Sequence, residues 1–591
     1  MAFYLSPLVD VNEIDLSTTI PAVATSIAVT VLRDTWKGDE LKRTLITTRD
    51  ELIENFGEPL TRANCYQDIL SATGYLKYGN ALYCTRAMAP SATFAGADGT
   101  LAATAVFNSF TTDNTYTLSS FSSEDPDEYP DEVSFGTGGV VDPNSTISFI
   151  SESRGAWGNY TKIAIVGRDV MSSALSGSSS TDYSLSAELD ADINAIDVNL
   201  SDDAEFVIIV KAASQKALTT FTIKETHVVS TKVRGLDDEG KNIFIENVIN
   251  QESNYIRVAL RSTVYEEDVN TGYTADYVTL GGGQDSDDSY VADVTSDADI
   301  ITAFNLYADP DLIDVNLFID SNKSVTVKEE LITICEARKD SMAILDCIKS
   351  DVVNTTGETT NIRDWKLGTF NPNTSYAALY GNWLEIYDRW NAKYRWIPAS
   401  GHVSGVYANT DDVNDPWFAP AGFNRAILTN IRRLAFNPTK GNRDILYQNG
   451  INPIVSFAGQ GKVVWGQKTV LGKSSAFNRV NVRRLFMTLE KALSTALKYF
   501  LFEPNDEFTR LQLVDMITPF LRDIEARRGL YDFMVVCDAR NNTAERIDRN
   551  ELWVDVYVKP TRAAEYVVLN MIATKTGASF TELVAATEVT A

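Results

Sequence analysis

The fold is decided by DVNLFIDSNKSVTVKEELITICEARKDSMAILD, residues 314–346. Its two ends, 314–319 and 342–345, are short apolar runs, and 327–338 carries apolar residues at helical spacing. Short runs of this kind favour buried strands, and the spacing between them favours a helix. A strand–helix–strand unit of this length predicts two adjacent parallel strands, which is typical of an α/β layer.

A second unit of mixed elements is predicted near the N-terminus. Residues 22–32 and 81–87 are rich in β-branched and small apolar residues and predict strands. Between them, 48–56 predicts a helix, because a threonine offers an N-cap at its start and Gly57 follows its end. A further helix is predicted over 66–78. Together these elements form a compact β-α-α-β unit.

The C-terminal part mixes aromatic-rich segments with amphipathic ones. Three helices are predicted there, over 424–436, 480–500 and 507–527. The strands predicted after them are 531–537, 552–558 and a strand-like final stretch at 564–573.

The middle of the chain has a different composition from both ends. From about residue 91, Ser, Thr, Asp and Gly become dense, and short β-branched runs such as 145–150 and 161–166 appear. This pattern predicts a β-rich region with many loops, which ends near the Gly- and Asp-rich stretch 281–299. The total of 591 residues, 44% of them hydrophobic, suggests roughly three or four domains with substantial cores.

The charge of the chain is also unevenly distributed. The net charge is −28, and the acidic excess lies within residues 91–330, while 421–550 is basic. An acidic middle of this kind favours a solvated exterior that keeps a large object soluble. It disfavours direct nucleic-acid binding by that region, because phosphates would be repelled.

The cysteines and the N-terminal sequence indicate the compartment. The five cysteines are scattered and contain no C-x-x-C pair, which predicts reduced, buried thiols in a protein made in a cytoplasm. Residues 1–17 have neither a basic region nor an apolar core typical of a signal peptide. No apolar run reaches the ~18 residues that a membrane span needs, so no direct membrane partner is predicted.

The search for chemistry finds no organised site. His227 in the β-rich middle and His402 in a Gly-flanked loop have no ligand or nucleophile motif beside them, so both are interpreted as structural. Gly459–Lys462 lacks the full phosphate-loop spacing and predicts a turn. A solvated loop is favoured over a calcium site for one acidic cluster, which comprises Asp285, Asp287, Asp288, Asp293, Asp297 and Asp299. The sequence therefore predicts no enzyme, catalytic residue, cofactor or metal, although a catalytic carboxylate pair among the 80 acidic residues stays open.

Short motifs spread along the chain carry a family resemblance. The motifs of the N-terminal and middle parts are Leu5–Glu13, Phe56–Pro59, Tyr75–Arg86, Gly155–Asn159 and Leu280–Asp285. The motifs of the C-terminal part are Trp417–Gly422, Leu446–Pro453, Val464–Thr469, Asn481–Leu485 and Phe502–Asn505. In this order and at this spacing they resemble the contractile tail sheath family of phages, which bacteriocin and type VI secretion sheaths share.

The resemblance implies an α+β multidomain fold, with an α/β sheath core and inserted β-rich domains. The implied segments are an extended arm at 1–20, core at 21–90, an outer β-rich insertion at 91–150, a second β-rich insertion domain at 151–300, core at 301–500 and a C-terminal assembly domain with its arm at 501–591.

The implied function is that of a structural subunit. It would polymerise helically around a tail tube and contract to drive the tube through the host envelope. Its partners would be further copies of itself, the tail tube protein, and baseplate and tail terminator proteins. It would be part of the virion tail and be assembled in the host cytoplasm. Another β-rich virion component, such as a baseplate or fibre protein, is the main alternative, and a secreted enzyme is the second.

The resemblance also implies which residues make the contacts. Extended arms at both chain ends would add strands to sheets in neighbouring copies. The residues expected in these arms are Leu5, Val9, Val11, Val567 and Leu569. Basic residues on a C-terminal helix would grip the tube through weak, exposed charge pairs. The preferred residues are Arg522, Arg527 and Arg528, and the second choice, from 480–500, is Arg483, Arg484, Lys491 and Lys498.

Overall fold

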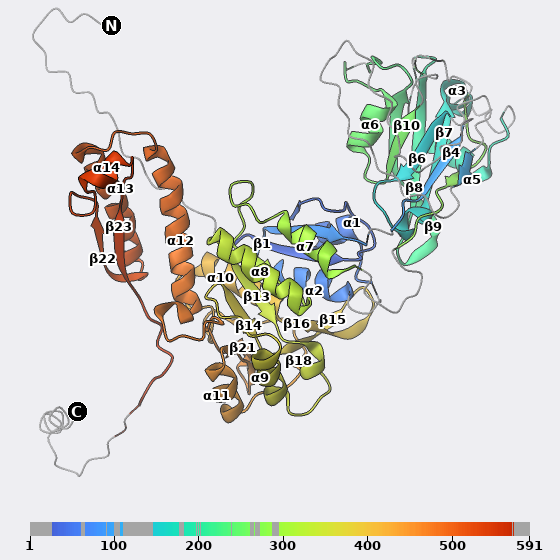
Figure 1. Cartoon of the computed structure of the whole chain (residues 1–591). Helices are drawn as coiled ribbons and strands as arrows, with labels where there is room; N and C mark the ends of the chain where they lie inside the picture. Colours follow the sequence, from blue (N-terminus) through green and yellow to red (C-terminus); the bar gives the residue numbers. More distant parts are fainter. Residues whose placement is uncertain are drawn as a thin grey trace, which may run out of the picture. The chain divides into compact units, whose positions relative to one another are not determined.

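A computed structural model describes residues 26–571, with gaps at 61–64, 90–91, 100–106, 110–145, 176–182, 197, 199, 201, 238, 261–264, 266, 268–271, 286–294 and 570. The chain divides into two compact units between Thr509 and Arg510. The first unit holds an α/β core and a β-rich insertion, and the second is a small α+β unit (Figure 1). None of the described helices is long and apolar enough to span a bilayer.

The core is built on a seven-stranded sheet in the order β19-β14-β13-β12-β1-β3-β2. Its strands are β1 (Ala28–Arg33), β2 (Thr44–Ile46), β3 (Leu82–Ala87), β12 (Leu317–Ile319), β13 (Met342–Asp346), β14 (Ala377–Tyr380) and β19 (Ile451–Asn452). All neighbours are parallel except β2, which runs antiparallel to β3 at one edge. The parallel pairing of β12 with β13 confirms the prediction from the deciding stretch.

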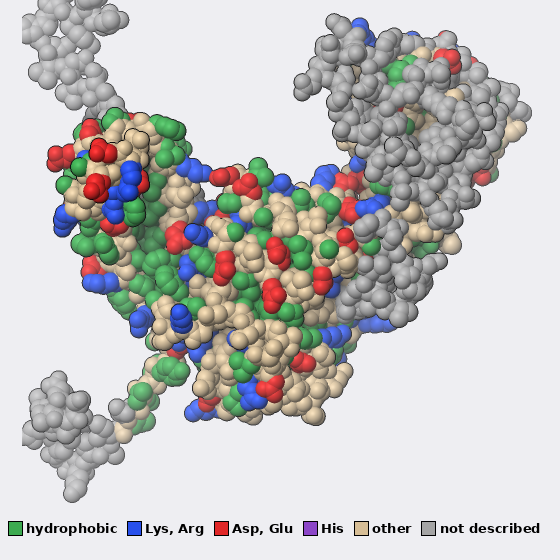
Figure 2. Space-filling model, viewed as in Figure 1, with side chains coloured by type: hydrophobic (Ala, Val, Ile, Leu, Met, Phe, Trp, Pro, Cys, Tyr) green, Lys and Arg blue, Asp and Glu red, His purple; other side chains and the backbone are tan. Residues whose placement is uncertain are grey.

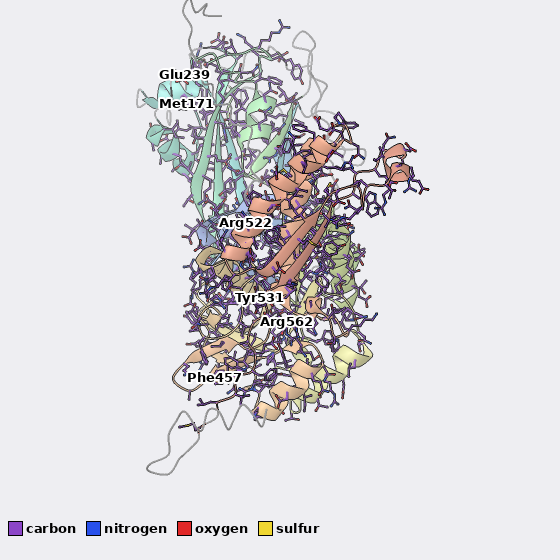
Figure 3. All side chains as sticks on the ribbon, turned by 90° about the vertical axis from the view of Figure 1, so that its left-hand side faces the viewer. Met171, Glu239, Phe457, Arg522, Tyr531 and Arg562 are labelled. Atoms are coloured by element: carbon purple, nitrogen blue, oxygen red, sulfur yellow. The ribbon has the colours of Figure 1, made fainter. Side chains whose placement is uncertain are left out.

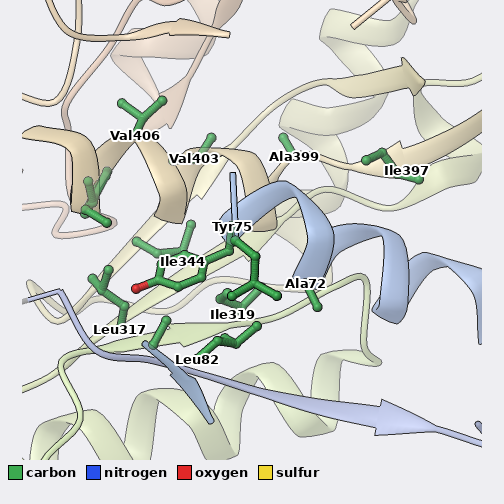
Figure 4. Close-up of a cluster of buried hydrophobic side chains, with 14 of the residues drawn as sticks. Ala72, Tyr75, Leu82, Leu317, Ile319, Ile344, Ile397, Ala399, Val403 and Val406 are labelled. Atoms are coloured by element: carbon green, nitrogen blue, oxygen red, sulfur yellow. The ribbon is translucent and has the colours of Figure 1, made fainter. Parts of the chain in front are cut away.

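Helices cover both faces of this sheet, so its strands alternate between two cores. The helices of the core are α1 (Arg49–Phe56), α2 (Cys65–Tyr75), α7 (Asp297–Asn305), α8 (Val325–Arg338), α9 (Glu358–Gly368), α10 (Ser400–Val413), α11 (Lys440–Gln448) and α12 (Val480–Leu497). One cluster joins the sheet to α2 and α10, and Figure 4 shows Tyr75, Ile344 and Val403 within it. The other joins the opposite face to α7, α8 and α9.

Two small antiparallel sheets complete the core. The first contains β15 (Trp383–Asp388), β16 (Lys393–Pro398) and β18 (Arg433–Leu434), and the second contains β17 (Ile427–Leu428), β20 (Ile454–Phe457) and β21 (Gly461–Val464). Gly459 and Gly461 have φ of 74° and 89° in the hairpin between β20 and β21. The turn predicted at 459–462 is confirmed for Gly459 and Gln460, whereas Gly461 and Lys462 begin β21.

The insertion leaves the core after β3 and returns before α7. It contains two four-stranded antiparallel sheets, in the orders β10-β6-β4-β5 and β11-β7-β8-β9. The strands are β4 (Gly96–Gly99), β5 (Phe107–Ser109), β6 (Ile147–Ser151), β7 (Thr161–Gly167), β8 (Glu205–Ser214), β9 (Ala217–Ser230), β10 (Ile256–Leu260) and β11 (Val278–Thr279). Its helices are α3 (Arg168–Leu175), α5 (Ala187–Ala195) and α6 (Ile245–Glu252). The predicted β-rich middle is confirmed for its described residues.

Two predictions about local structure are wrong. Residues 424–436 form no helix; they contain β17 and β18, and between them Asn430 has a φ of 62°, which an α-helix cannot accommodate. His402 lies inside α10 and not in a loop. Its flanking glycines were interpreted as loop residues, but they let α10 approach α2: a Cβ on Gly401 would lie 2.2 Å from the carbonyl oxygen of Ser71.

Candidate assembly surfaces

The long helix α13 (Glu507–Ala526) is amphipathic. Its start is capped by Asp506, whose carboxylate accepts a hydrogen bond of 2.8 Å from the backbone N–H of Thr509. The residues buried along one face are Leu513, Ile517, Leu521 and Ile524, three or four positions apart. The helix ends where Arg528 adopts a φ of 66° and Gly529 donates to the carbonyl of Ile524. The predicted helix over 507–527 is confirmed.

The second unit continues with a two-stranded antiparallel sheet. β22 (Leu530–Val536) pairs with β23 (Asp555–Pro560), which confirms both predicted strands. On one face Met534 lies opposite Tyr557, and both side chains are exposed. Beside them the Lys559 ammonium contacts the Asp532 carboxylate at 2.6 Å, and this hydrogen bond lowers the pKa of Asp532.

Two asparagines that the sequence analysis did not single out hold the connection between these strands. The Asn541 amide donates to the carbonyls of Val536 and Trp553, at 2.8 and 3.1 Å. Asn542 accepts from the N–H of Trp553 and donates to its carbonyl. Both side chains are buried, and the short helix α14 (Ala544–Asp548) follows them. The only sequence signal was the Asn-Asn pair itself, which is also typical of an ordinary exposed loop.

The sheet of the second unit has two open edges. Within the part of the chain that the structure describes, β22 and β23 have only each other as partners. A two-stranded sheet is marginal by itself, and an unpaired edge offers a row of backbone donors and acceptors to an incoming strand. This geometry can accept a strand on either side.

The segment after β23 is apolar and exposed. Tyr566, Val567, Val568 and Leu569 each have 80–88% of their surface exposed, and Figure 2 shows hydrophobic side chains along this segment. The predicted strand over 564–573 is not formed in the described residues 564–569 and 571, because none of their backbone pairs with a neighbouring strand. Val567 and Leu569 are thus available for contacts outside their own unit.

The preferred basic residues lie on the exposed surface of the second unit. Arg522 projects from α13, and Figure 3 labels it together with Tyr531 on β22. Arg527 forms a long ion pair of 3.6 Å with Asp523, and both side chains are more than half exposed. Arg528 is exposed at the helix end. Such pairs exchange partners at little cost, since each contributes about 0–1 kcal/mol.

The second set of basic residues is engaged inside the first unit. Arg484 forms a buried ion pair with Asp411, and Arg483 donates to the hydroxyl of Tyr376 at 3.2 Å. Lys491 pairs with Asp314, and Lys498 pairs with Asp311 at 2.8 Å. These contacts support α12 (Val480–Leu497) and the 3-10 turn that follows it, so the structure favours an intramolecular role for this set.

The remaining predicted residues are placed as follows. Leu5, Val9 and Val11, together with Asp287, Asp288 and Asp293, lie outside the described residues. Asp285 accepts a hydrogen bond from the N–H of Ala156, and Asp299 forms a capping box with Ser296 at the start of α7, where Asp297 also lies. All five cysteines are buried, as predicted, and none of them is in a disulfide.

Both histidines have structural surroundings. His402 is buried beneath α2, and burial together with the charges of Lys77 and Arg49 lowers its pKa to about 4. His227 on β9 contacts the Glu225 carboxylate at 3.1 Å. Among the described residues, no three His, Cys, Asp or Glu side chains are grouped as metal ligands.

Models of known protein families match the C-terminal half of the chain, which includes the features described above. Residues 301–470 match the phage tail sheath protein central domain, and residues 472–574 match the phage tail sheath C-terminal domain. The second match includes α13, the open-edged sheet and the exposed segment. Residues 301–574 therefore match phage tail sheath domains almost throughout.

Curated members of the phage tail sheath family align with this chain at substantial identity. The tail sheath protein of Vibrio phage KVP40 is 37% identical over 406 residues, which are 65% of this chain and 57% of that protein. The tail sheath protein of Enterobacteria phage T4 is 34% identical over 398 residues, 64% of this chain and 58% of that protein. The aligned part thus spans a little over half the length of these relatives.

The fold also resembles a solved member of the family. The crystal structure of a sheath tail protein from Listeria innocua superposes with a TM-score of 0.51 at 13% identity, covering 91% of this chain and 96% of that one. At this identity the likeness concerns the fold, and it agrees with the predicted α+β multidomain architecture.

Proposed function

We propose that this chain is the subunit of a contractile tail sheath. Copies polymerise helically around a tail tube and contract to drive the tube through the host envelope. The observation that carries the proposal is the second unit, where a two-stranded sheet with two open edges lies next to an exposed apolar segment. Within the described residues, no further strand pairs with β22 or β23, and residues 566–569 stay exposed. The exposed segment of one copy can add a strand to an open sheet edge of a neighbouring copy.

The join between copies is strand addition. Residues 561–571 of one copy, including Val567 and Leu569, add to an open edge of β22 or β23 in the next. The arm at 1–20, with Leu5, Val9 and Val11, adds to the other edge. Main-chain hydrogen bonds supply the affinity, so the contact keeps neighbours connected while their bodies rotate. A head-to-tail contact whose rotation does not close builds a helix.

The proposed partners follow from this role. They are further copies of the chain, the tail tube protein, and the baseplate and tail terminator proteins at the two ends of the tube. The chain has no catalytic role, contacts neither nucleic acid nor membrane directly, and works in the virion tail after assembly in the host cytoplasm. The acidic insertion faces solvent, where its charge keeps the tail soluble.

Electron microscopy of the purified full chain tests the proposal. Hollow striated tubes support a sheath. The alternatives are another virion component, which gives trimeric rods in the case of a fibre and closed rings in the case of a baseplate protein, and an enzyme, which gives compact particles. Any of these three outcomes at concentrations that polymerise other sheath proteins overturns the proposal.

Two variants test the strand addition. Deleting residues 1–20 removes one of the two added strands. Replacing Val567→Asp together with Leu569→Asp places charges in the other strand, where burying them has a large cost. We expect each variant to leave a folded monomer and to abolish tubes. The matched control is Leu312→Asp with Val413→Asp, which changes two other exposed apolar side chains, both in the first unit. Tubes that form and shorten normally with either test variant would rule out the join.

A further inference from the structure

A cavity of about 460 Å³ lies at the carboxyl edge of the seven-stranded sheet. Three parallel neighbouring strands end at its wall. Arg33 is the last residue of β1, residues 322–325 follow β12, and Ile348 follows β13. The starts of α7 and α8 and one side chain of α9 complete the wall. The cavity is therefore built by the α/β core alone.

The cavity lies where the order of the strands reverses. From β1 the chain continues to β3 on one side of it, and later it places β12, β13 and β14 in turn on the other side. The helices that follow such diverging strands leave a crevice outside their carboxyl ends, and in open α/β sheets ligands bind in this crevice. The position of the cavity thus favours a ligand site over an accidental gap.

The start of α8 supplies backbone donors to the cavity wall. Ser324 caps this helix by accepting from the N–H of Val327, and Ser324 and Val325 both line the cavity. Val325 is the first helical residue, so its N–H has no acceptor within the helix. The first turn of α8 contains no acidic residue, so the positive end of its dipole is not offset there. Such a helix start favours an anion.

The indole of Trp365 points independently to a ligand. This side chain of α9 forms part of the cavity wall, and only 7% of its surface is exposed. Its ring stacks on Phe370 with centroids 5.3 Å apart, which limits its orientation. The indole N–H finds no acceptor among the described residues. Because buried donors are nearly always satisfied, an acceptor atom of a bound ligand is the partner that this N–H lacks.

Three cationic side chains line the same wall. The Arg33 guanidinium and the Lys323 ammonium both contact the Asp68 carboxylate, at 2.8 and 2.7 Å. The Lys328 ammonium contacts the Asp320 carboxylate at 2.9 Å. Each cation is thus held in place by a carboxylate, and one carboxylate serves two of the three.

The wall of the cavity is rich in hydrogen-bond donors. Of the described charged residues that line it, only Asp297 is anionic, and this residue is exposed at the start of α7. Phosphate oxygens only accept hydrogen bonds when ionised, and they are bound in proteins by backbone N–H groups at helix starts together with cationic side chains. This set of donors suits a phosphate group.

A second hollow indicates the size of the ligand. Its volume is about 450 Å³, and it shares Asn322 and Ile348 with the first cavity. Val353 gives it an apolar wall, and Lys349 and Ser350 give it polar groups. Pockets of ~300–1,000 Å³ hold ligands much larger than a single ion. The two adjoining hollows therefore fit a phosphate that carries an organic group.

We propose that this cavity binds a phosphate monoester of nucleotide size. The phosphate lies at the start of α8, where it accepts from the backbone N–H of Val325 and from the indole N–H of Trp365. The organic group extends into the second hollow. The proposal does not depend on the chain forming a sheath.

Isothermal titration calorimetry on the purified full chain tests the site with three probes. Inorganic phosphate should bind with a Kd of about 1 mM or tighter. Adenosine monophosphate should bind about tenfold more tightly, because its organic group adds contacts in the second hollow. Adenosine, which lacks the phosphate, should give no binding heat.

Two variants remove one donor each. Trp365→Phe keeps a ring and loses the indole N–H. Val325→Pro loses the backbone N–H at a first helical position, which proline accepts, and Ser324 before it has the extended φ of −62° and ψ of 166° that proline requires. Each variant should weaken the binding of inorganic phosphate about tenfold, because each removes one hydrogen bond to a charged group.

Matched controls make the same changes away from the cavity. Trp553→Phe removes an indole N–H that donates to Glu551 in the second unit. Ala187→Pro places proline at the first position of α5, after Ser186 with φ of −64° and ψ of 148°. Both should bind phosphate like the parent chain.

Three results would overturn the proposal. The first is no binding of inorganic phosphate up to about 10 mM. The second is an affinity for phosphate that either Trp365→Phe or Val325→Pro leaves unchanged. The third is adenosine monophosphate that binds no more tightly than inorganic phosphate, which would make the free ion the ligand and leave the second hollow without a role.

Discussion

Asp68 is a buried charge that the core cannot lose. Its carboxylate accepts from Arg33 at 2.8 Å and contacts Lys323 at 2.7 Å, and all three side chains are buried. Burial alone would raise the pKa of Asp68, but the charges of Arg33 and Lys323 outweigh burial and lower it. Stability from this group is present above its unfolded pKa and is lost as the pH falls through its folded pKa.

Replacing Asp68→Asn should cost about 3–5 kcal/mol of stability, because two buried cations would lose their counter-charge. Thermal unfolding at neutral pH measures the effect on the first unit. Asp50→Asn is the control, since the Asp50 side chain is 93% exposed and pairs with Arg389 at the surface. An Asp68→Asn variant as stable as the control would show that the cluster contributes little.

The lowered pKa of the buried His402 predicts that the folded chain loses stability as the pH falls. Its pKa is lowered to about 4 in the folded chain, so below its ordinary value the unfolded chain binds a proton that the folded chain does not. Stability should fall by up to about 3 kcal/mol as the pH drops from about 6.5 to 4. The His402→Leu variant should lose less of its melting temperature than the parent chain between neutral and acidic pH. Equal losses would contradict this.

The packing of α2 against α10 illustrates what residue patterns can and cannot predict about an element. The structure uses Gly401 and Gly405 to bring α10 against α2, whose Gly74 would meet the His402 ring at 2.4 Å if it carried a Cβ. Such a close approach is decided by the partner helix, which lies more than 300 positions earlier in the chain. Local sequence carries no sign of it.

Replacing Gly401→Ala should destabilise the first unit by about 3 kcal/mol, because the new methyl group meets the backbone of Ser71, which cannot rotate away. Gly441→Ala in α11 is the matched change, with no atom near its Cβ position. It should stabilise the chain by about 0.5–1 kcal/mol. Urea or thermal unfolding of both variants measures the contrast, and a neutral Gly401→Ala would refute the close contact.

Elements whose ends are marked by neighbouring residues in the sequence, such as helix caps, were predicted well. The cap of α1 is one example: Thr48 accepts from the N–H of Glu51, and the Glu51 carboxylate accepts from the N–H of Thr48 in return. The helix predicted over 424–436 failed for the opposite reason. Its apolar residues pair with distant strands, since Ile427 lies opposite Val463 and Leu434 opposite Leu384. Long-range pairing overrides a helical pattern.

At the scale of the whole molecule, the sequence predicted the α/β core and its β-rich insertion. It did not predict the order of the sheet strands, in which β1 lies between β3 and β12. It also missed the role of Asn541. It did not predict that the buried Arg86 guanidinium donates both to the carbonyls of Thr35 and Gly38 in the core and to the carbonyl of Arg154 in the insertion. Each of these depends on residues brought together only by the complete fold. The domain boundaries that the resemblance implied stay a prediction.

The proposed contact with the tail tube involves the molecule as a whole, because it joins the folded chain to another protein. Arg522→Glu, Arg527→Glu and Arg528→Glu together should weaken growth of the sheath on tail tubes and leave the monomer folded, because three exposed positive charges at the end of α13 become negative. Co-sedimentation with purified tubes measures growth, and circular dichroism measures folding. The control reverses the exposed Arg540 and Arg549 together with the partly exposed Arg363, all of which lie outside α13 and pair with neighbouring acids. Normal co-assembly by the first triple variant would remove these arginines from the contact.

The position of β1 in the sheet has a consequence for synthesis on the ribosome. β1 is made before the insertion, yet its neighbour β12 begins only at Leu317, after the insertion has been completed. The nascent core therefore waits with one edge of β1 unpaired while the insertion folds. We expect the acidic insertion, which emerges at that moment, to repel other nascent chains and so to reduce premature pairing at this edge.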